Sequence, residues 1–295
     1  MPFHFQTFKV RAITALVFVA VMLTGILYNQ WSFLLLIGII HFGCWIEYKK
    51  LIDLIDPAYS SISSLHSNMV MLIGGCFVLL NTQPDYLKVG NIALSAIGWY
   101  GIMLLTIVFC AKEIVFKKII DLKSIGYSVF GWCYISLSWG LLIKLRSLNL
   151  FFTTKQGQYI DLGWLFPIIL IASIWINDTM QYLVGSFFGK TPFSKISPKK
   201  TWEGTVGGSA LAIVTVGLFD SMYLGLPMAT SFVIPIIAAV IGTLGDLLES
   251  KLKRMANVKD SGQIMPGHGG FLDRFDSILL AAPFVWLFVY FAYSY

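Results

Sequence analysis

Residues 229–254 run ATSFVIPIIAAVIGTLGDLLESKLKR, and this stretch decides the fold class. It opens as an apolar run close to the roughly 20 residues that a helix needs to cross a bilayer. It ends in interleaved acids and bases. Asp246 lies inside the apolar run, where an ionised side chain is costly and usually marks a functional site that faces the interior of a helix bundle. The stretch therefore predicts a membrane-spanning helix with chemistry at one end.

The composition of the whole chain agrees with this prediction. Of the 295 residues, 57% are hydrophobic and 12% are charged, whereas soluble domains carry about 25% charged residues. The mean hydropathy is +0.77, which excludes an ordinary water-soluble domain. A net charge of +6 is compatible with nucleic-acid binding. However, basic residues in membrane proteins mostly report topology, so we expect no nucleic-acid partner.

Nine apolar stretches reach or approach the length of a bilayer span. With the N-terminus in the cytoplasm, 17 of the 21 basic residues fall in cytoplasmic segments, as the positive-inside rule requires. We therefore predict an all-α polytopic integral membrane protein with a cytoplasmic N-terminus and a retained first helix. The predicted spans are residues 10–27, 31–47, 66–81, 92–111, 126–143, 160–177, 205–224, 229–249 and 277–294.

We expect one membrane domain over residues 1–295, with an uneven distribution of polar residues. Residues 1–176 would form scaffold helices, 177–276 would carry cytoplasm-facing catalytic motifs, and 277–295 would form the last helix. The middle region holds eight of the 15 acids and nine of the 21 bases, so the candidate chemistry concentrates there.

The first motif runs from Asn177 to Lys190. If the sixth span continues through it as a helix, Asp178, Tyr182, Gly185 and Gly189 share one small, polar face. This face is either a glycine-lined packing seam or a carboxylate over a cavity into which a ligand fits against glycine.

The second motif is Ser197-Pro198-Lys199-Lys200, followed by Thr201, Trp202 and Glu203. Ser followed by Pro is typical of an N-cap and first helical position, which predicts both lysines in the first helical turn. The helix dipole disfavours cations there, unless an anion such as phosphate binds the same turn. The alternative is ordinary positive-inside charge.

The third motif lies at the end of the eighth span, where Asp246, Glu249, Ser250 and Lys253 share one helix face. Lys253 and Arg254 agree with the dipole of a helix C-terminus. Asp246 has no such simple explanation, and a divalent cation would offset the cost of its burial.

The fourth motif covers residues 259–276. Its Pro-Gly-His-Gly-Gly segment, residues 266–270, requires special backbone angles and leaves N–H groups free for an anion. Asp273 and Asp276 follow at helical spacing. They are either acids at a helix start or oxygen ligands for a hard metal ion.

Carboxylates without a Cys/His cluster, among many Lys and Arg residues, favour Mg²⁺ and polyphosphate over zinc. Catalysis would rest on positioning and charge neutralisation. A phosphomonoester nucleophile is largely dianionic at neutral pH, so it needs no general base. His268 is therefore either catalytic or an ordinary loop histidine.

The run Ser250-x-x-Lys253-Arg254-x4-Lys259-Asp260-x-Gly262-x-x-x-Pro266-Gly267-His268-Gly269-Gly270-x-x-Asp273-Arg274-x-Asp276 resembles the signature of the phosphatidate cytidylyltransferase, or CDP-diacylglycerol synthase, family. The two upstream motifs also resemble that family, and so does the Glu47-Tyr48-x-x-Leu51 end of the second span. Gln181 departs from it, because the family commonly has Ala there, and so does Ser186, where many bacterial members have a basic residue.

The resemblance implies a reaction of CTP with phosphatidic acid that gives CDP-diacylglycerol and pyrophosphate in a membrane, with Mg²⁺ and, in some members, K⁺ as a second ion. It implies Asp246 and Asp273 as metal ligands. It is compatible with a homodimer and with a bacterial inner-membrane enzyme whose site faces the cytoplasm. The candidate catalytic residues are Asp246, Asp273, Asp276, Lys253, Arg254 and His268. The candidate substrate-binding residues are Asp178, Tyr182, Ser197, Lys199, Lys200, Thr201, Glu203, Glu249, Lys259, Asp260, Gly269, Gly270 and Arg274.

Two other functions compete with this one. Another enzyme acting on lipid phosphates, such as a CTP-dependent polyprenol kinase, would use similar groups, whereas the pattern of CDP-alcohol phosphotransferases is absent from the sequence. A cation transporter would explain Asp246 as part of an ion path. It gives no reason for the Ser-Pro-Lys-Lys and Pro-Gly-His-Gly-Gly motifs.

Overall fold

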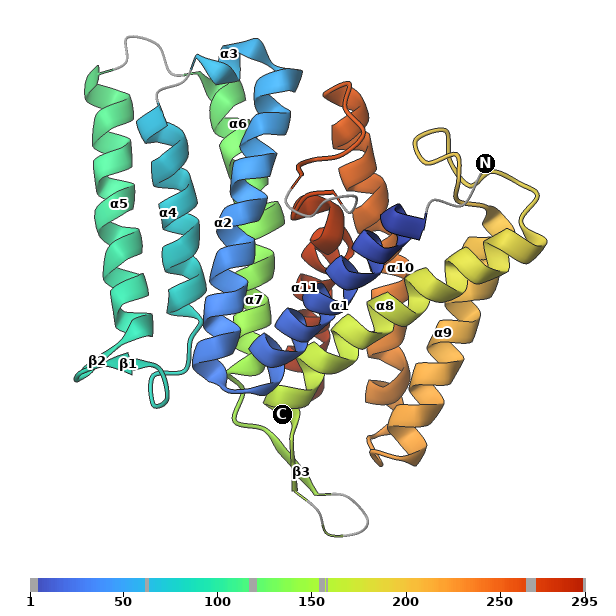
Figure 1. The fold of residues 1–295 in the computed structure, drawn as a ribbon. Helices are drawn as coiled ribbons and strands as arrows, with labels where there is room; N and C mark the ends of the chain where they lie inside the picture. The colour runs from blue at the N-terminus through green and yellow to red at the C-terminus, as the bar shows by residue number, and fades with distance from the viewer. Residues whose placement is uncertain are drawn as a thin grey trace. The chain divides into compact units, whose positions relative to one another are not determined.

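A computed structural model describes residues 5–61, 64–116, 121–153, 157, 159–263 and 269–293. Long helices dominate it, and the strands form two short antiparallel hairpins (Figure 1). β1 (Lys88–Val89) pairs with β2 (Ile92–Ala93), and β3 (Phe151–Thr153) pairs with β4 (Tyr159–Asp161). The helices are α1 (Phe5–Leu27), α2 (Gln30–Ile55), α3 (Pro57–Ser60), α4 (Ser64–Leu80), α5 (Leu94–Phe116), α6 (Leu122–Gly131), the π-helical turn η1 (Trp132–Ser136), α7 (Leu137–Arg146), α8 (Leu162–Phe188), α9 (Trp202–Met222), α10 (Met228–Met255) and α11 (Leu272–Tyr293).

Seven helical stretches of the described residues are long and apolar enough to cross a membrane. The chain is therefore an all-helical membrane protein, as its composition predicts. Two further apolar stretches, Leu16–Leu27 and Ser64–Leu80, are shorter, so the count of nine spans and the orientation stay predictions. The seven are Gln30–Ile55, Leu94–Val115, Leu122–Arg146, Leu162–Phe188, Trp202–Met222, Met228–Met255 and Leu272–Tyr293.

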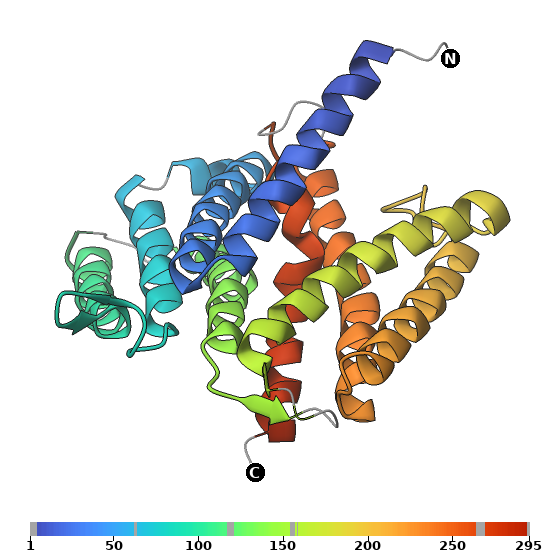
Figure 2. The same ribbon diagram turned by 60° about the horizontal axis from the view of Figure 1, so that its bottom comes forward.

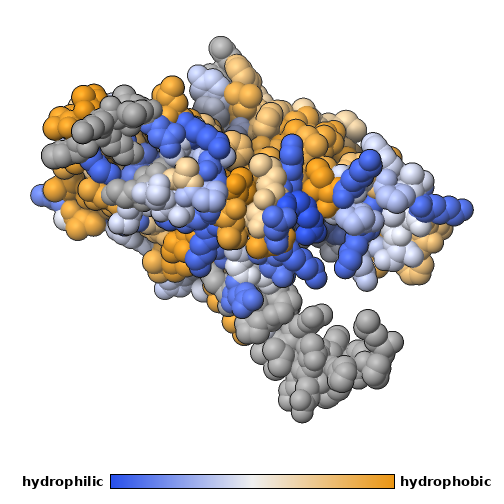
Figure 3. Space-filling view, turned by 90° about the horizontal axis from the view of Figure 1, so that it is seen from above, coloured by the Kyte–Doolittle hydropathy of each residue, from blue (hydrophilic) through white to orange (hydrophobic). Residues whose placement is uncertain are grey.

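Apolar surfaces on these helices face outward, as expected for contact with lipid. Leu104 and Ile107 of α5 are each 63% exposed. Exposing apolar side chains such as these to water would be unfavourable. On the face seen in Figure 3, hydrophilic side chains lie among hydrophobic ones. This face of the molecule therefore carries polar side chains as well as apolar ones.

Helix bounds differ from the predicted ones where helices continue past their apolar runs. The predicted span at 31–47 extends to Ile55 in α2, and its last two turns include an i,i+4 ion pair of 2.6 Å between Lys49 and Asp53. The span predicted at 160–177 extends to Phe188 in α8, and the one predicted at 277–294 starts at Leu272 in α11. Apolar length therefore marked the spans but not the helix ends.

The chain forms two compact units that interleave along the sequence. The first unit comprises Met1–Ile143 and Met255–Phe275, and the second comprises Lys144–Arg254 and Asp276–Tyr295. The predicted division of one membrane domain at residues 176 and 276 stays a prediction.

The first unit is built around α2, which lies alongside α4 in a layer with α5 (Figure 1). Asn29 caps α2 in a reciprocal capping box with Ser32. Buried polar groups join the helices: the Ser136 hydroxyl of η1 lies 3.0 Å from His41 Nε2 and accepts a hydrogen bond from Trp45 Nε1 at 2.8 Å. The polar core therefore fixes α2, which also carries Glu47.

The second unit is centred on α8 and α9, which lie side by side in both views (Figure 2). The Asp161 side chain caps α8 by accepting hydrogen bonds from Gly163 N and Trp164 N. The α8 and α9 backbones approach closely because glycines meet there: a Cβ on Gly204 of α9 would come 2.7 Å from Gly185 Cα. Gly185 therefore packs in a glycine seam with α9, as one interpretation of the first motif predicts, while the ligand-site interpretation of Asp178 and Tyr182 stays a prediction.

Candidate functional site

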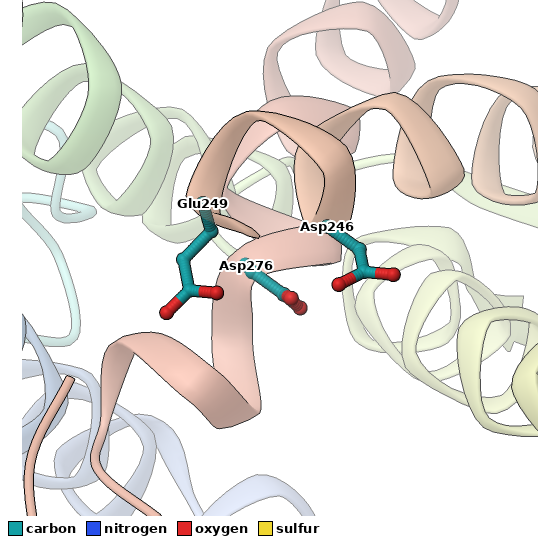
Figure 4. Close-up of side chains that lie close together, drawn as sticks. All are labelled: Asp246, Glu249 and Asp276. Atoms are coloured by element: carbon teal, nitrogen blue, oxygen red, sulfur yellow. The ribbon is translucent and has the colours of Figure 1, made fainter. Parts of the chain in front are cut away.

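Three carboxylates come together in the second unit. Asp246 and Glu249 project from α10, and Asp276 lies between them on α11 (Figure 4). One oxygen of each lies within 4.8 Å of the others. Glu249 is fully buried, while the other two are partly exposed. Because α10 is helical throughout this region, the predicted shared face of Asp246 and Glu249 is confirmed.

Two lysines neutralise part of the charge on this carboxylate cluster. Lys200 pairs with Asp246, and Lys253 pairs with Glu249 one turn along α10. Asp178 of α8 is within electrostatic range of both Lys200 and Asp246. With Asp276, the second unit therefore brings together predicted residues from all four motifs.

The donor set of the carboxylate cluster fits a hard divalent cation. Its ligand atoms are carboxylate oxygens, as Mg²⁺ prefers, and they converge on one another as well as on ammonium groups. Carboxylates held this close repel one another, and a cation bound between them would offset that repulsion. The same geometry is compatible with a phosphate-bound metal ion, because the lysines would then be available for phosphate oxygens.

The Ser-Pro-Lys-Lys motif does not begin a helix, contrary to the prediction. Lys200 N donates to Ser197 O at 3.1 Å, which closes a turn with Pro198 at its second position. Helix α9 starts later, and Thr201 is its N-cap, accepting from Gly204 N at 3.1 Å. The two lysines therefore lie outside the first helical turn, and their clash with the dipole disappears without an anion.

Glu203 holds the loop before α9. Its Oε2 accepts hydrogen bonds from the backbone N–H groups of Lys190 and Thr191, each at 3.1 Å, and its Oε1 accepts from Thr191 Oγ1 at 2.9 Å. As an acid in the first turn it also agrees with the dipole of α9. These contacts account for Glu203 structurally, and its predicted role in substrate binding stays a prediction.

The face of α8 that carries Asp178 and Tyr182 is open. Asp178 is exposed and Tyr182 is 74% exposed, whereas Gly185 packs toward α9. Gly189 ends the helix in extended backbone and does not continue the face. Within the second unit, Tyr182 therefore stands at a surface, where its substrate role also stays a prediction.

Gln181 lies in a polar network that the sequence did not reveal. Its Nε2 lies within hydrogen-bonding distance of Asn177 Oδ1 at 3.2 Å, Ser209 Oγ at 3.1 Å and Thr243 Oγ1 at 2.9 Å. These partners lie on α8, α9 and α10. The only sequence signal was the departure from the family at this position, and the structure shows that the larger side chain is used to join three helices.

Asp273 belongs to the first unit, where protein donors surround its carboxylate. Its Oδ2 accepts from Ser261 N at 2.9 Å, Ser261 Oγ at 2.9 Å and Gly270 N at 2.8 Å. Gly269 beside it has φ of +80°, so the predicted special backbone angle is confirmed at this residue, while residues 266–268 lie outside the described residues. Its assignment as a metal ligand together with Asp246 stays a prediction.

The remaining candidate residues lie at the surface or outside the described residues. His268 falls within 264–268, outside the described residues. Lys199 is also exposed. The side chains of Arg254, Lys259, Asp260 and Arg274 are exposed, as expected for groups that would meet a soluble substrate.

Known proteins are similar to this chain over most of its length. A sequence model of the Cytidylyltransferase family matches residues 9–292. The chain belongs to the cytidylyltransferase family. As a member it is a nucleotidyltransferase, and its apolar helices make it a membrane enzyme.

Relatives within the family align over most of their lengths. A phosphatidate cytidylyltransferase of Haemophilus influenzae is 30% identical over 96% of this chain and 99% of its own. One of Synechocystis is 30% identical over 95% of each chain, and one of Bacillus subtilis is 34% identical over 70% of this chain and 72% of its own. The likeness to the first two therefore extends across both units.

Proposed function

We propose that this chain transfers the CMP group of CTP to phosphatidic acid, with Mg²⁺ as its metal ion. The observation that carries the proposal is the cluster of Asp246, Glu249 and Asp276, with two lysines on it, in a member of the cytidylyltransferase family. The names of the relatives, phosphatidate cytidylyltransferase, supply the two substrates.

In the proposed reaction, a phosphate oxygen of phosphatidic acid attacks the α-phosphorus of CTP. A new O–P bond forms, and the bond between the α-phosphorus and the oxygen that bridges to the β-phosphate breaks. The products are CDP-diacylglycerol and pyrophosphate, which carries away the bridging oxygen and its electrons. The attacking phosphomonoester is largely dianionic at neutral pH, so the chain need not supply a general base.

Asp246, Glu249 and Asp276 would hold the metal ion, which when bound neutralises charge on the phosphates. Asp273, one turn before Asp276 on α11, stays the second sequence-based ligand candidate. Lys200 and Lys253 would turn from their carboxylate partners to phosphate oxygens when substrate brings negative charge. The other proposed phosphate or substrate contacts are Asp178, Tyr182, Ser197, Lys199, Thr201, Glu203, Arg254, Lys259, Asp260, Gly269, Gly270 and Arg274.

The proposal includes a setting in the cell. We place the site on the cytoplasmic side of a bacterial inner membrane, so that CTP arrives from water while the lipid reaches it laterally. K⁺ as a second ion and a homodimeric assembly are part of the proposal because the family resemblance includes the first and permits the second.

The test uses CTP labelled at either of two phosphates. Detergent-purified protein is incubated with phosphatidic acid, Mg²⁺ and CTP carrying ³²P at the α- or the γ-position. Cytidylyl transfer puts the α-label into the lipid phase and the γ-label into pyrophosphate. A lipid kinase would instead put the γ-label into the lipid, and a cation transporter would move neither label.

Matched variants connect the reaction to the site. Asp246→Asn is expected to lower turnover by at least 10²-fold while the protein still elutes as a folded species. Asp85→Asn makes the same chemical change at a 78% exposed side chain outside the site and should leave turnover unchanged. Absence of α-label in lipid with a folded wild-type protein, with K⁺ and several acyl chains tested, would refute the proposal.

A further inference from the structure

Glu47 of α2 is a buried carboxylate that binds a distant segment of the chain. It is 4% exposed. Its Oε1 accepts from Phe271 N at 2.9 Å, and its Oε2 accepts from Leu272 N at 2.9 Å and from Ser261 Oγ at 2.7 Å. The donors lie at least 214 residues away in sequence. All of them belong to the segment of residues 256–271 that connects α10 to α11 (the connector) or to the first residue of α11.

Glycines in the connector leave room for this carboxylate. A Cβ on Gly262 would come 2.6 Å from Glu47 Cδ, and one on Gly270 would come 2.5 Å from the same atom. One turn earlier on α2, a Cβ on Gly43 would lie 2.6 Å from Cγ of the Phe271 ring. Real side chains do not approach this closely, so three glycines are needed for α2 to hold the connector at this distance.

Asp273 also binds the connector, and we call the hydrogen bonds of Glu47 and Asp273 to it the anchorage. It accepts from Ser261 N, Ser261 Oγ and Gly270 N, so the serine hydroxyl lies between the two carboxylates. Glu47 and Asp273 together hold the connector at residues 261–262 and 269–271, and Glu47 also holds Leu272. Hydrogen bonds to ionised acceptors are about twice as strong as neutral ones, which makes this anchorage a substantial local constraint.

The contacts of Glu47 include the first residue of α11. Glu47 accepts from the N–H of Leu272, the first residue of α11, and satisfies a donor that the helix leaves without an internal partner. Asp276 of the carboxylate cluster follows one turn later on the same helix, and α10 with Asp246 and Glu249 runs into the connector's other end. The candidate contacts Lys259, Asp260, Gly269 and Gly270 lie in the connector itself.

We infer that Glu47 is a positioning residue for nucleotidyl transfer: it touches no substrate, but it fixes the connector and the start of α11 in the arrangement that the reaction requires. This inference rests on the proposed function. A purely structural role would affect folding alone, whereas positioning affects the rate of a folded enzyme.

The principal test compares Glu47→Gln with Asp53→Asn. Glutamine keeps the size of the side chain but replaces one acceptor oxygen with an NH₂ group that faces N–H and O–H donors. Asp53→Asn makes the same change on the same helix, at the partly exposed ion pair with Lys49. Purified variants are compared for kcat and KM with CTP, for thermal unfolding, and for trypsin cleavage after Lys259, which is exposed in the connector.

For Glu47→Gln we expect kcat/KM for CTP to fall about 10- to 100-fold, which corresponds to about 1.4–2.8 kcal/mol. Cleavage after Lys259 should become at least fivefold faster because a released segment is a better protease substrate. Unfolding should stay cooperative. Asp53→Asn should match the wild type in all three measurements. Rates and cleavage within twofold of the wild type for Glu47→Gln would overturn the inference.

Ser261→Ala keeps the inference testable if Glu47→Gln does not fold. It removes one of the three donors and leaves Glu47 in place, so kcat/KM should fall about threefold to tenfold and cleavage should still accelerate. No change in either measurement would refute the anchorage. If the wild type makes no CDP-diacylglycerol, the proposed function fails, whereas the protease comparison still reports whether Glu47 holds the connector.

Discussion

Asp276→Asn is expected to stabilise the metal-free protein while it weakens the response to Mg²⁺. Asp276 shares the cluster with two other carboxylates, whose ligand oxygens lie within 4.8 Å. Two unit charges at about 4.8 Å repel by roughly 3.5 kcal/mol at an effective dielectric constant of about 20. The ammonium groups on Asp246 and Glu249 cancel much of this repulsion. We therefore expect about 1–2 kcal/mol of stabilisation when Asp276 is neutralised.

Thermal unfolding in detergent measures both halves of this prediction. In EDTA, the stabilisation should raise the apparent Tm by about 2–8 °C, taking roughly 2–4 °C per kcal/mol. A ligand at 100 times its Kd adds about 2.7 kcal/mol to stability, so saturating Mg²⁺ should raise the Tm of the wild type by several degrees. The variant lacks one of the negatively charged carboxylate ligands. Saturating Mg²⁺ should therefore raise its Tm by less than half as much as it raises the Tm of the wild type.

Asp85→Asn is the control, because Asp85 is exposed and lies outside the cluster. Its free energy of unfolding should stay within about 0.5 kcal/mol of that of the wild type in both buffers. The reasoning is wrong if Asp276→Asn melts below the wild type in EDTA, or if Mg²⁺ stabilises both proteins equally. The first result would mean that Asp276 supports the fold through contacts other than charge, and the second that it does not bind the ion.

Three further predictions concern the fold. Gly204→Ala should destabilise the protein by about 1–3 kcal/mol, because its Cβ would press against Gly185 Cα at 2.7 Å, and a fall in Tm would measure this. Gln181→Ala should cost about 1–3 kcal/mol by removing hydrogen bonds among three helices, and an unchanged Tm would contradict the network. Hydrogen bonding to Lys123 holds the pKa of Asp56 below its usual value, so this pair adds stability at neutral pH that is lost as the pH falls below about 4. In acid titrations followed by unfolding, Asp56→Asn should show a shallower loss of stability than the wild type.

The sequence predicted most of the helices and the shared face of Asp246 and Glu249, because both depend on local spacing. Asp246 and Glu249 are three residues apart inside a continuous apolar helix, so their common face needed no tertiary information. Their approach to Asp276 did need it, since only the packing of α10 against α11 brings those oxygens together. The spacing of Asp273 and Asp276 favoured both as ligands equally.

The start of α9 was mispredicted because two capping signals compete within five residues. Ser197-Pro198 is one, and Thr201 with Glu203 in the following turn is the other. The second agrees with the helix dipole, which favours an acid in the first turn, whereas the first would place Lys199 and Lys200 there. The unfavourable interaction of Lys199 and Lys200 with the dipole of a helix that starts at Ser197 was thus evidence for a later start. In the structure the helix does start later, with Thr201 as its N-cap.

Glu47 and Gln181 could not be assigned from the sequence because their partners are distant. Glu47 receives its donors from residues at least 214 positions away, and Gln181 reaches Ser209 and Thr243 on other helices. No periodicity or motif near either residue encodes these partners. Their only signals were a resemblance at Glu47 and a departure from the family at Gln181.

The hydrogen bonds that an acidic side chain accepts distinguish structural acids from candidate metal ligands more clearly than the spacing of the acids in the sequence does. Glu47, Glu203 and Asp273 each accept hydrogen bonds from two backbone N–H groups and lie within hydrogen-bonding distance of a hydroxyl, which Glu47 and Asp273 share. Their charge is therefore already stabilised, and a cation adds little. Asp246 and Asp276 instead face other carboxylates, and for them a cation removes repulsion as well as adding attraction. It follows that Asp273→Asn should slow the reaction chiefly by loosening the connector, with the Mg²⁺ concentration for half-maximal rate nearly unchanged. Asp276→Asn should raise that concentration at least tenfold. A tenfold rise for Asp273→Asn would return Asp273 to the metal site and show that its three donors yield to the ion.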